Sequence, residues 1–546
     1  MANLFADFLD KPSVGLWPSD YRAAVSSNAV QSTNYYDKTQ RKGAVRVIKR
    51  MFLRLSNINI MKQESSDNYG HVLKYTGVFG GVQGLVILIG LVRNKFMALL
   101  LGASGMGFNA LFVSAQSFAS QCTNLGISYG GIPKLSGYYE QNRTKLVEYY
   151  IQVIRLWSII AAVLGCLFCI AVSPLINNLS FTWGNHTLHY AMLGVSVAML
   201  AITGGETAIL KATRKLGAVA RVQIYTVVAS VILSIPLYYF LRHSGVVIAI
   251  VLIAGAGMLV TISYSYRYHP LNLQFRKSQL KYGLSMIRIG MAFVLAAAVG
   301  SASEMVIRAF LNIEGGLDIV GMYNVGFMLT ITYAGMVFSA MESDYFPRLS
   351  GVCKDIARTN EMVNKQTEVS LLLLSPMLVG LIMLLPVLIP LLFSREFMPV
   401  VGMAQVAVMA MYFKVMTMPV AYITLARSLS LSYLLLETSY FVVLVAAVIF
   451  GFRHWGLWGT GLAVVFAHVF ECIVVGGYSY LYYGFRSNAM VLQYALVQFT
   501  IGLAAYCVTL TVEGWPYWMA EGALTLISAV YSFSVLRHKP IRIFNV

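Results

Sequence analysis

Long apolar runs recur along this 546-residue chain from about residue 75 almost to its C-terminus. The run LLLLSPMLVGLIMLLPVLIPLLF at 371–393 contains no charged residue and no alternation of polar and apolar positions. A membrane-spanning helix needs about 20 apolar residues, whereas a barrel strand shows about ten residues of alternating polarity. Only 11% of the residues are charged, roughly half of what a soluble protein carries. The sequence therefore predicts an all-α polytopic membrane protein.

Fourteen spans can be drawn along the chain. Their limits are 75–101, 107–128, 156–176, 189–210, 222–241, 245–265, 289–310, 319–341, 370–393, 401–424, 432–451, 458–481, 490–512 and 517–536. Residues 1–70 are polar and lack the pattern of a cleaved leader. Two explanations of this segment stay open: a cytoplasmic tail, or a true start at Met51 or Met61 behind an over-extended gene model.

The basic residues predict the orientation in the membrane. With the N-terminus inside, nineteen Lys and Arg residues fall on or beside the cytoplasmic connections, and three fall on the opposite ones. The nineteen include Arg155, Lys215, Arg221 and Arg267, and the three are Arg242, Arg395 and Arg453. Because Lys and Arg accumulate on the cytoplasmic side, both termini are predicted to be cytoplasmic. The net charge of +18 is mostly this bias, so it does not call for a nucleic-acid partner.

Four basic residues remain that neither the connections nor the termini explain. They are Arg93, Lys95, Arg308 and Lys414. Charged side chains inside membrane spans are rare and usually functional.

The chain also contains an internal duplication. GIPKLSGYY at 131–139 is echoed by YFPRLSGVC at 345–353, an offset of 214 residues that also places Gly107 over Gly321. Each unit contains six spans, so both units have the same orientation, and parallel repeats of this kind enclose a substrate path. We predict a lobe of helices 1–6 (71–275), a lobe of helices 7–12 (276–485), a central cavity between them, and two further helices in 486–546.

Two stretches resemble a known family. VFGGVQGLVILIGLVRNKFMALLLGASGMG at 78–107 resembles the first helix of bacterial polysaccharide repeat-unit flippases, and MESDYFPRLSG at 341–351 resembles the motif that ends their eighth helix. These O-antigen and capsule translocases form the polysaccharide transport family of the multidrug/oligosaccharidyl-lipid/polysaccharide superfamily. The resemblance implies two six-helix lobes around a central cavity, in the bacterial cytoplasmic (inner) membrane. It also implies transport of an undecaprenyl-diphosphate-linked oligosaccharide from the inner to the outer leaflet.

Arg93 and Lys95 lie in the outer half of the first span, since Arg93 is about 27 Å along the helix from Tyr75. They are about 200° apart around the helix, so they cannot both face one partner. Either residue can reach the headgroups, as long basic side chains do at helix ends, or face the cavity. We expect cavity contact more strongly for Arg93 than for Lys95.

Arg308 is the strongest candidate for substrate contact. It lies four residues after Glu304 on one helical face, so a self-neutralising pair is the structural alternative. Either way, an intramembrane ion pair must face protein or water. Fixed guanidinium groups would offset the cost of moving a diphosphate through a region of low dielectric constant.

Other polar residues suggest further cavity positions. Asn109, Gln116, Ser120 and Thr123 form one stripe on the second span, and Tyr323 with Asn324 occupies the corresponding end of the second lobe. Hydrogen bonding between helices is as good an explanation of this stripe as contact with sugar.

Transport needs a source of energy, and the chain has no GxxxxGK[ST] motif for a nucleotide. No catalytic residue, metal or cofactor is expected. An intramembrane acid can couple transport to an ion by changing its protonation. Glu304 is the first candidate, although Arg308 would hold it ionised. His468 and Glu471, for which no neighbouring cation is evident in the sequence, are the alternative.

The cytoplasmic ends of the repeated motifs predict a gate. Asp344 and Arg348 are four residues apart, and Lys134 is the counterpart of Arg348 in the first lobe. We expect acids and bases at these ends to pair across the lobes when the cavity is closed inward.

Three classes of function are compatible with the composition. The first is the flippase, whose partners would be a polyprenyl-diphosphate-linked oligosaccharide, membrane lipids, and the polymerase and glycosyltransferases of the same pathway. The second is a multidrug or small-cation antiporter of the same superfamily, disfavoured by the surplus of buried basic residues. The third, a membrane-embedded enzyme, is disfavoured because the connections are too short for a catalytic domain.

Overall fold

The computed structural model describes residues 68–182, 184–271, 277–332, 335, 338, 345, 346, 348–427 and 429–537. The chain divides into two units, Met1–Lys74 and Tyr75–Val546, and the fold below is that of the second. The predicted polar tail before residue 68 and the predicted gate residue Asp344 lie outside the described residues.

Helices make up almost all of the regular structure, and the described ranges contain no β-strand. Ten helical stretches in these ranges are long and apolar enough to cross a membrane, which confirms the all-α polytopic fold. The helices are α3 (Asn68–Thr123), α4 (Ile127–Glu140), α5 (Thr144–Ser180), α6 (Thr187–Ala212), α7 (Leu216–Leu241), η2 (Arg242–Ser244), α8 (Gly245–Tyr268), α9 (Lys277–Phe327), η3 (Met328–Thr332), α11 (Ile356–Leu392), η4 (Arg395–Phe397), α12 (Val400–Ala426), α13 (Ser430–Tyr483), α14 (Ala489–Thr511) and α15 (Trp515–Arg537).

Four of the ten stretches, 39 to 54 residues long, are each interrupted once by a residue with positive φ. The interruptions are Gly102 in α3, Gly316 in α9, Gly456 in α13, and Arg242 between α7 and α8. Glycine adopts such angles without a steric penalty because it has no Cβ atom. Each interruption falls where two predicted spans meet, although the count of fourteen crossings stays a prediction.

The interruptions recur at the spacing of the repeated sequence motif. Gly316 follows Gly102 by 214 positions, and Gly456 follows Arg242 by the same number. Their angles match within each pair: φ 67° and ψ −165° against 82° and 176°, then 48° and −129° against 60° and −144°. Equal conformations at equal spacing support the internal duplication well beyond the short motif.

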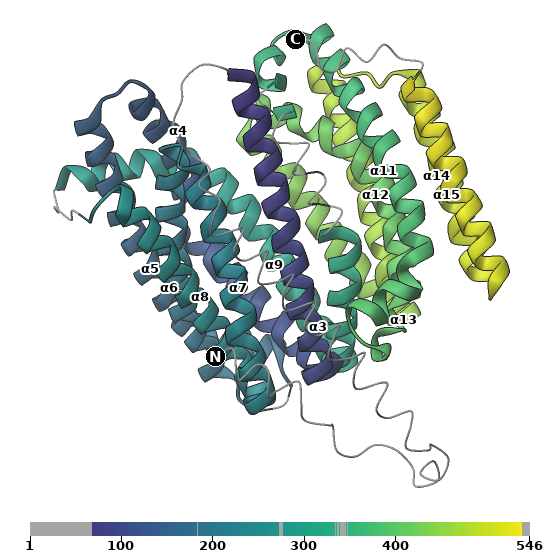
Figure 1. The fold of residues 1–546 in the computed structure, drawn as a ribbon, viewed down its shortest axis with the longest axis horizontal. Coiled ribbons are helices and arrows are strands. Elements are labelled where there is room, and N and C mark those ends of the chain that lie inside the picture. Colours follow the sequence, from purple (N-terminus) through teal and green to yellow (C-terminus); the bar gives the residue numbers. More distant parts are fainter. Residues whose placement is uncertain are drawn as a thin grey trace, which may run out of the picture. The chain divides into compact units, whose positions relative to one another are not determined.

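Packing separates the helices into two groups (Figure 1). In the first, α5 packs on α6 and α4, and α8 packs on both α6 and α7. In the second, α11 packs on α12, α14 and α15, and α12 packs on α13. We call α3–α8 the N-terminal lobe and α9–α15 the C-terminal lobe. Helix α9 joins them, because it contacts α4 and α5 as well as α12 and α13.

The two lobes touch through backbone at equivalent positions of the duplication. A Cβ atom on Gly107 would lie 1.9 Å from the carbonyl oxygen of Leu317, and one on Gly321 would lie 2.0 Å from that of Ala103. No side chain fits at these distances, so both positions require glycine. The predicted correspondence of Gly107 and Gly321 is thus also a direct contact between α3 and α9.

Candidate functional site

The guanidinium of Arg308 joins the two limbs of α9 on either side of Gly316. Its Nη1 donates to the carboxylate of Glu304 at 2.8 Å, and its Nη2 donates to Oδ1 of Asn324 at 3.2 Å. The Arg308 side chain is 8% exposed, whereas that of Glu304 is 45% exposed. The Nε–H of Arg308 is buried and has no acceptor among the described residues. Of the predicted cavity residues, Tyr323 is buried beside this group and Asn324 is part of it.

A second polar group lies between α12 and α13 in the same lobe. Lys414 Nζ donates to Glu471 at 3.3 Å and lies 5.6 Å from the ring centroid of Tyr440. The Tyr440 hydroxyl is 3.5 Å from Nε2 of His468, and both residues are buried. The sequence shows no cation close to Glu471 and His468 along the chain, and the structure supplies one from another helix, since Lys414 lies 57 positions away from Glu471.

The two groups form one polar region. The hydroxyl of Tyr440 lies within electrostatic reach of Glu304 in the first group and of Glu437 and Glu471 in the second. Formally, the region contains two bases, Arg308 and Lys414, and three acids. The predicted surplus of buried positive charge is thus absent from this part of the C-terminal lobe.

Three consecutive residues of α3 reach three different elements. Arg93 acts electrostatically on the buried Tyr238 of α7, and its own buried Nε–H has no acceptor among the described residues. Asn94 donates to the sulfur of Met328 at 3.4 Å. Lys95 donates to the carbonyl oxygen of Pro390 at 3.1 Å. The predicted divergence of Arg93 and Lys95 is therefore present, and the contacts given for Arg93 and Arg308 are in different lobes.

Two of the contacts between the lobes join a charge to a helix end. Lys95 binds a carbonyl in the last turn of α11, where the helix dipole is negative. Glu396 of η4 accepts from the backbone N–H of Ala103 at 3.2 Å, at the start of the α3 limb that follows Gly102. That limb begins with positive partial charge. At the equivalent break, nothing lies within 4 Å of a Cβ on Gly316, so this arrangement is specific to one repeat.

The polar stripe on the second span serves packing within the N-terminal lobe at two of its four positions. Gln116 donates to Ser196 of α6 at 2.8 Å, and Thr123 donates to the carbonyl of Ala119. Asn109 and Ser120 are partly buried, and no contact of either favours one explanation. Sugar contact at Asn109 and Gln116 stays a prediction.

The predicted gate residues are only partly described. Lys134 of α4 donates to the hydroxyl of Ser285 on α9 at 2.8 Å. This contact crosses from one lobe to the other, but its partner is a serine rather than an acid. Arg348 is exposed. With Asp344 outside the described residues, acid–base pairing at this gate stays a prediction.

A further buried ion pair was missed in the sequence. Arg155, counted above among the cytoplasmic borders, is 4% exposed and donates to Glu206 at 2.8 Å and to the carbonyls of His269 and Pro270. It therefore holds the point at which α8 ends and the connection to α9 begins. Burial, with the charges of Arg155 and Lys215, lowers the pKa of His269. Only the apolar surroundings of Glu206 in the sequence could have indicated this pair.

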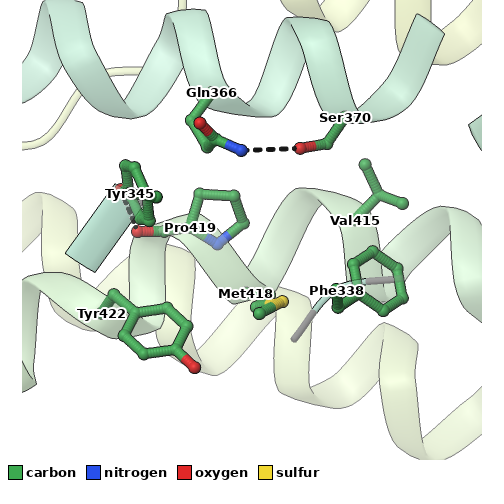
Figure 2. A pocket seen from close by; sticks show the side chains of 8 residues that line it. All are labelled: Phe338, Tyr345, Gln366, Ser370, Val415, Met418, Pro419 and Tyr422. Carbon is green, nitrogen blue, oxygen red and sulfur yellow. Dashed lines mark hydrogen bonds between the residues drawn. The ribbon is translucent and has the colours of Figure 1, made fainter. Parts of the chain in front are cut away.

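A small pocket lies beside α12 in the C-terminal lobe (Figure 2). Tyr345 donates to the carbonyl of Pro419 at 2.7 Å, and Gln366 donates to Ser370 at 3.2 Å. A volume of about 10 Å³ gives room for about one water molecule. The other lining residues are Phe338, Val415, Met418 and Tyr422, and none of the predicted site residues lines it. We exclude this pocket as a site for a sugar.

Among the described residues, no group of three or more His, Cys, Asp and Glu side chains could bind a metal ion. The polar region formed by α9, α12 and α13 brings together charged side chains from three helices. Sequence reasoning found Glu304, Arg308, Tyr323, Asn324, His468 and Glu471 in it. It did not assign Lys414 or Glu437 to a site, although both lie inside predicted spans.

The fold is shared with transporters of the MOP superfamily. The lipid II flippase MurJ, in an inward closed conformation, superposes with a TM-score of 0.62 at 14% identity, covering 84% of this chain and 98% of that one. An inward-facing MATE family multidrug resistance transporter gives 0.61 at 13% identity, covering 72% and 94%. An outward-facing MATE structure gives 0.54 at 12% identity, covering 75% and 94%. The chain is thus a multi-pass membrane protein with the architecture of flippases and transporters.

The sequence places the chain within a narrower group. Residues 96–402 match the family model of polysaccharide biosynthesis proteins, and the chain belongs to that family. A comparison with curated protein sequences finds no match.

Proposed function

We propose that the protein moves an undecaprenyl-diphosphate-linked oligosaccharide from the inner to the outer leaflet of the bacterial cytoplasmic membrane. The family and the fold support a flippase or transporter that acts in polysaccharide synthesis. The observation that carries the substrate class is the buried Nε–H of Arg308, which has no acceptor among the described residues. A buried donor without an acceptor costs about 1–3 kcal/mol, so a phosphate oxygen there would be strongly favoured.

Glu304 is a partner of Arg308 that the substrate could replace. Its carboxylate neutralises Arg308 at 2.8 Å, but its side chain is almost half exposed whereas Arg308 is buried. A diphosphate entering the polar region would replace Glu304 and receive a paired contact from the guanidinium. Asn324 would keep the guanidinium in place during this exchange, because it binds the other terminal nitrogen.

Arg93 extends the site toward the N-terminal lobe. It also has a buried Nε–H without an acceptor among the described residues, and it lies on the helix whose next two residues contact the C-terminal lobe. We assign Arg93 to the diphosphate as it passes between the lobes, with Asn109, Gln116 and Tyr323 at the sugars. Lys95 is placed at the end of α11 by its contact, and we propose that it reaches the substrate only after that contact breaks.

Transport would proceed by alternating access, with the lobes of residues 71–275 and 276–485 moving relative to each other. Both termini would be cytoplasmic, and the two helices in 486–546, α14 and α15, would pack outside the lobe of residues 276–485. The end formed by Lys134 and Arg348 would then face the cytoplasm and close there, with Asp344 as an acidic partner. Glycosyltransferases would supply the substrate and a polymerase would consume it; the protein itself would catalyse no bond change.

Coupling to an ion or to the membrane potential would use Glu471 and His468. Lys414 already neutralises Glu471, so binding of a proton or metal cation at that carboxylate would release Lys414. Because Tyr440 contacts His468 and lies near Glu304, this release would reach the Arg308 group. Glu304 is less suited to this role because its carboxylate is already bound by Arg308 at 2.8 Å.

An antiporter for organic cations is the second candidate. It is favoured by one observation, the formal excess of acids over bases in the polar region of the C-terminal lobe. Such a substrate would pair with Glu304 or Glu437 rather than with Arg308. The two candidates therefore predict opposite effects of neutralising Arg308.

The test replaces Arg308 in a strain whose surface polysaccharide depends on this protein. With Arg308→Ala, we expect loss of surface polymer and accumulation of lipid-linked repeat units that remain accessible only from the cytoplasmic leaflet. With Arg308→Lys, which keeps the charge but loses the planar fork, we expect partial activity.

The matched control is Arg453→Ala. Arg453 is also paired with a glutamate of α9, Glu314, at 2.7 Å, but it is 58% exposed at a helix end. Normal surface polymer in a well-expressed Arg308→Ala strain would contradict the proposal. Unchanged polymer together with retained or raised resistance to organic cations would favour the antiporter.

A further inference from the structure

One end of the α7–α8 hairpin gathers cations around tyrosine rings. Lys215, at the N-terminus of α7, has its Nζ 5.1 Å from the ring of Tyr268. One to two turns further along α7, the guanidinium carbon of Arg221 lies 5.5 Å from the ring of Tyr264. Arg267 also acts electrostatically on Tyr264. We call Lys215, Arg221 and Arg267 the α7–α8 basic cluster.

Two acids near this cluster are already paired elsewhere, and a third, Glu148, acts together with Lys215 on His269. Glu140 pairs with Arg214, and the buried Glu206 pairs with Arg155. No ion pair of the basic cluster occurs within the described ranges. Arg221 and Arg267 are exposed, so their guanidinium groups are accessible to molecules outside the protein.

The duplication provides an internal comparison. At an offset of 214 residues, the tyrosines of α8 recur as Tyr478 and Tyr482, whose rings stack at 4.5 Å. All three cations are replaced by leucine. These leucines are Leu429, Leu435 and Leu481, which are 42%, 61% and 76% exposed.

The replacement of these cations by leucine in the second repeat shows that the excess of Lys and Arg at cytoplasmic connections does not by itself explain the cluster. The two hairpins are built alike, since Arg242 and Gly456 interrupt them with the same backbone angles at the same offset. Parallel repeats place both tyrosine pairs at the same side of the membrane. A bias that only sets topology would be met by cations at either hairpin, yet the first carries three at these positions and the second carries exposed leucines there that suit acyl chains. The second hairpin keeps one cation at this end, Arg427, which lies 4.8 Å from the ring of Tyr483 and donates to the carbonyl of Cys353.

An apolar surface continues from the cluster along α7. Arg221, Tyr225 and Ile232 are spaced by four and seven residues and so lie on one face of the helix. Tyr225 is 44% exposed and Ile232 is 51% exposed. The surface therefore has a basic end, which can bind an anionic headgroup, and an apolar stretch, which can contact an acyl chain.

We propose that this face of α7–α8 is a binding site for an anionic phospholipid of the surrounding leaflet. The lipid phosphate accepts hydrogen bonds from Arg221, Arg267 and Lys215, while one acyl chain lies along Tyr225 and Ile232. Arginine suits this role because its planar fork binds two phosphate oxygens at once. Basic residues between membrane helices are a known way to hold anionic headgroups. The site is distinct from the polar region around Arg308 and does not depend on the proposed transport.

The experiment measures lipid retained by the purified full-length protein. The wild type is exchanged into mixed micelles of phosphatidylglycerol and phosphatidylcholine, and bound lipid is quantified by mass spectrometry. The test variant carries Lys215→Leu, Arg221→Leu and Arg267→Leu, which copies the second repeat onto the first. Each cation near a membrane surface contributes about five-fold, so the variant should bind phosphatidylglycerol roughly 100-fold more weakly.

Two further variants make the result specific. The control, Arg242→Leu with Arg453→Leu, removes basic residues from the other helix ends and should retain phosphatidylglycerol as the wild type does. The converse variant, Leu429→Lys with Leu435→Arg and Leu481→Arg, should bind additional phosphatidylglycerol. All proteins must show the same unfolding temperature in phosphatidylcholine micelles, so that loss of folding is not read as loss of lipid.

The site is refuted if the test variant retains phosphatidylglycerol like the wild type, or if the control loses as much. A competition arm with inorganic pyrophosphate separates the sources of phosphate. If pyrophosphate displaces the lipid at equal concentration, the cluster binds free phosphate groups and the lipid assignment is wrong. Displacement only at large excess supports a site that needs both the headgroup and the acyl chain.

Discussion

Neutralising Glu396 should shift the balance between the conformations of the two lobes. Its carboxylate accepts from Ala103 N–H across the lobe boundary, at the positive end of a helix limb. A charge at such an end contributes about 0.3–1 kcal/mol when exposed and up to ~2 kcal/mol when partly buried. Glu396→Gln keeps the size and an acceptor oxygen but removes the charge. We therefore expect a loss of ~1 kcal/mol, which changes the ratio of joined to separated forms about five-fold.

The assay is distance measurement between spin labels in a cysteine-free background. Leu146 at the start of α5 and Leu481 at the end of α13 are 39% and 76% exposed, and they belong to different lobes. Labels there should report a larger separated population in Glu396→Gln than in the wild type. Lys95→Met should act in the same direction, because it removes the contact with the end of α11.

Glu314→Gln is the matched control. It removes a glutamate charge that is paired with Arg453 inside the C-terminal lobe and crosses no lobe boundary. An unchanged distance distribution in Glu396→Gln, or an equal shift in Glu314→Gln, would refute the reasoning that a charge at the start of this limb holds the lobes together.

Further predictions concern stability, measured by unfolding in detergent. Arg242 adopts angles that favour glycine, so Arg242→Gly should stabilise the fold by about 1 kcal/mol, and Gly456→Ala at its counterpart should destabilise it by about as much. Lys414→Met should cost roughly 3 kcal/mol because it leaves Glu471 buried without its partner, and adding Glu471→Gln should recover part of that loss. The pKa of His269 is lowered in the folded state, so the unfolded chain binds a proton first. Stability should therefore be complete above the ordinary histidine pKa of about 6.5 and fall as the pH decreases below it, and His269→Gln should reduce that dependence.

The fold could be predicted from the sequence because a membrane-spanning helix requires a continuous apolar run, and such a run is visible in a short stretch of sequence. Apolar runs give the helices, and the short repeat around Pro133 and Pro347 gives the pairing of the lobes. Each break lies between two predicted spans, but the residue at which it occurs could not be identified in this way. Gly102 and Gly316 are two of 45 glycines, and only their backbone angles distinguish them.

The polar region was predictable only where its contacts follow helical spacing. Glu304 and Arg308 are one turn apart, so their pairing is evident in the sequence. Lys414 and Glu471 meet because two helices pack, and no local pattern records that distance. The same holds for Lys95, whose partner is the main-chain carbonyl of Pro390, 295 residues away. Every residue has such a carbonyl, so the residue type at position 390 does not indicate the contact.

The backbone contact of Gly107 with Gly321 has a mechanical consequence. Surfaces without side chains have no rotamers to repack, so one lobe can rotate against the other there without interlocked groups resisting it. Since the two glycines are counterparts in the duplication, the axis that relates the repeats passes beside them. A rotation about this fulcrum moves helix ends near it by little and distant ends by much. A small change in the contacts close to the glycines can therefore move the helix ends on the far face of the membrane by a large distance.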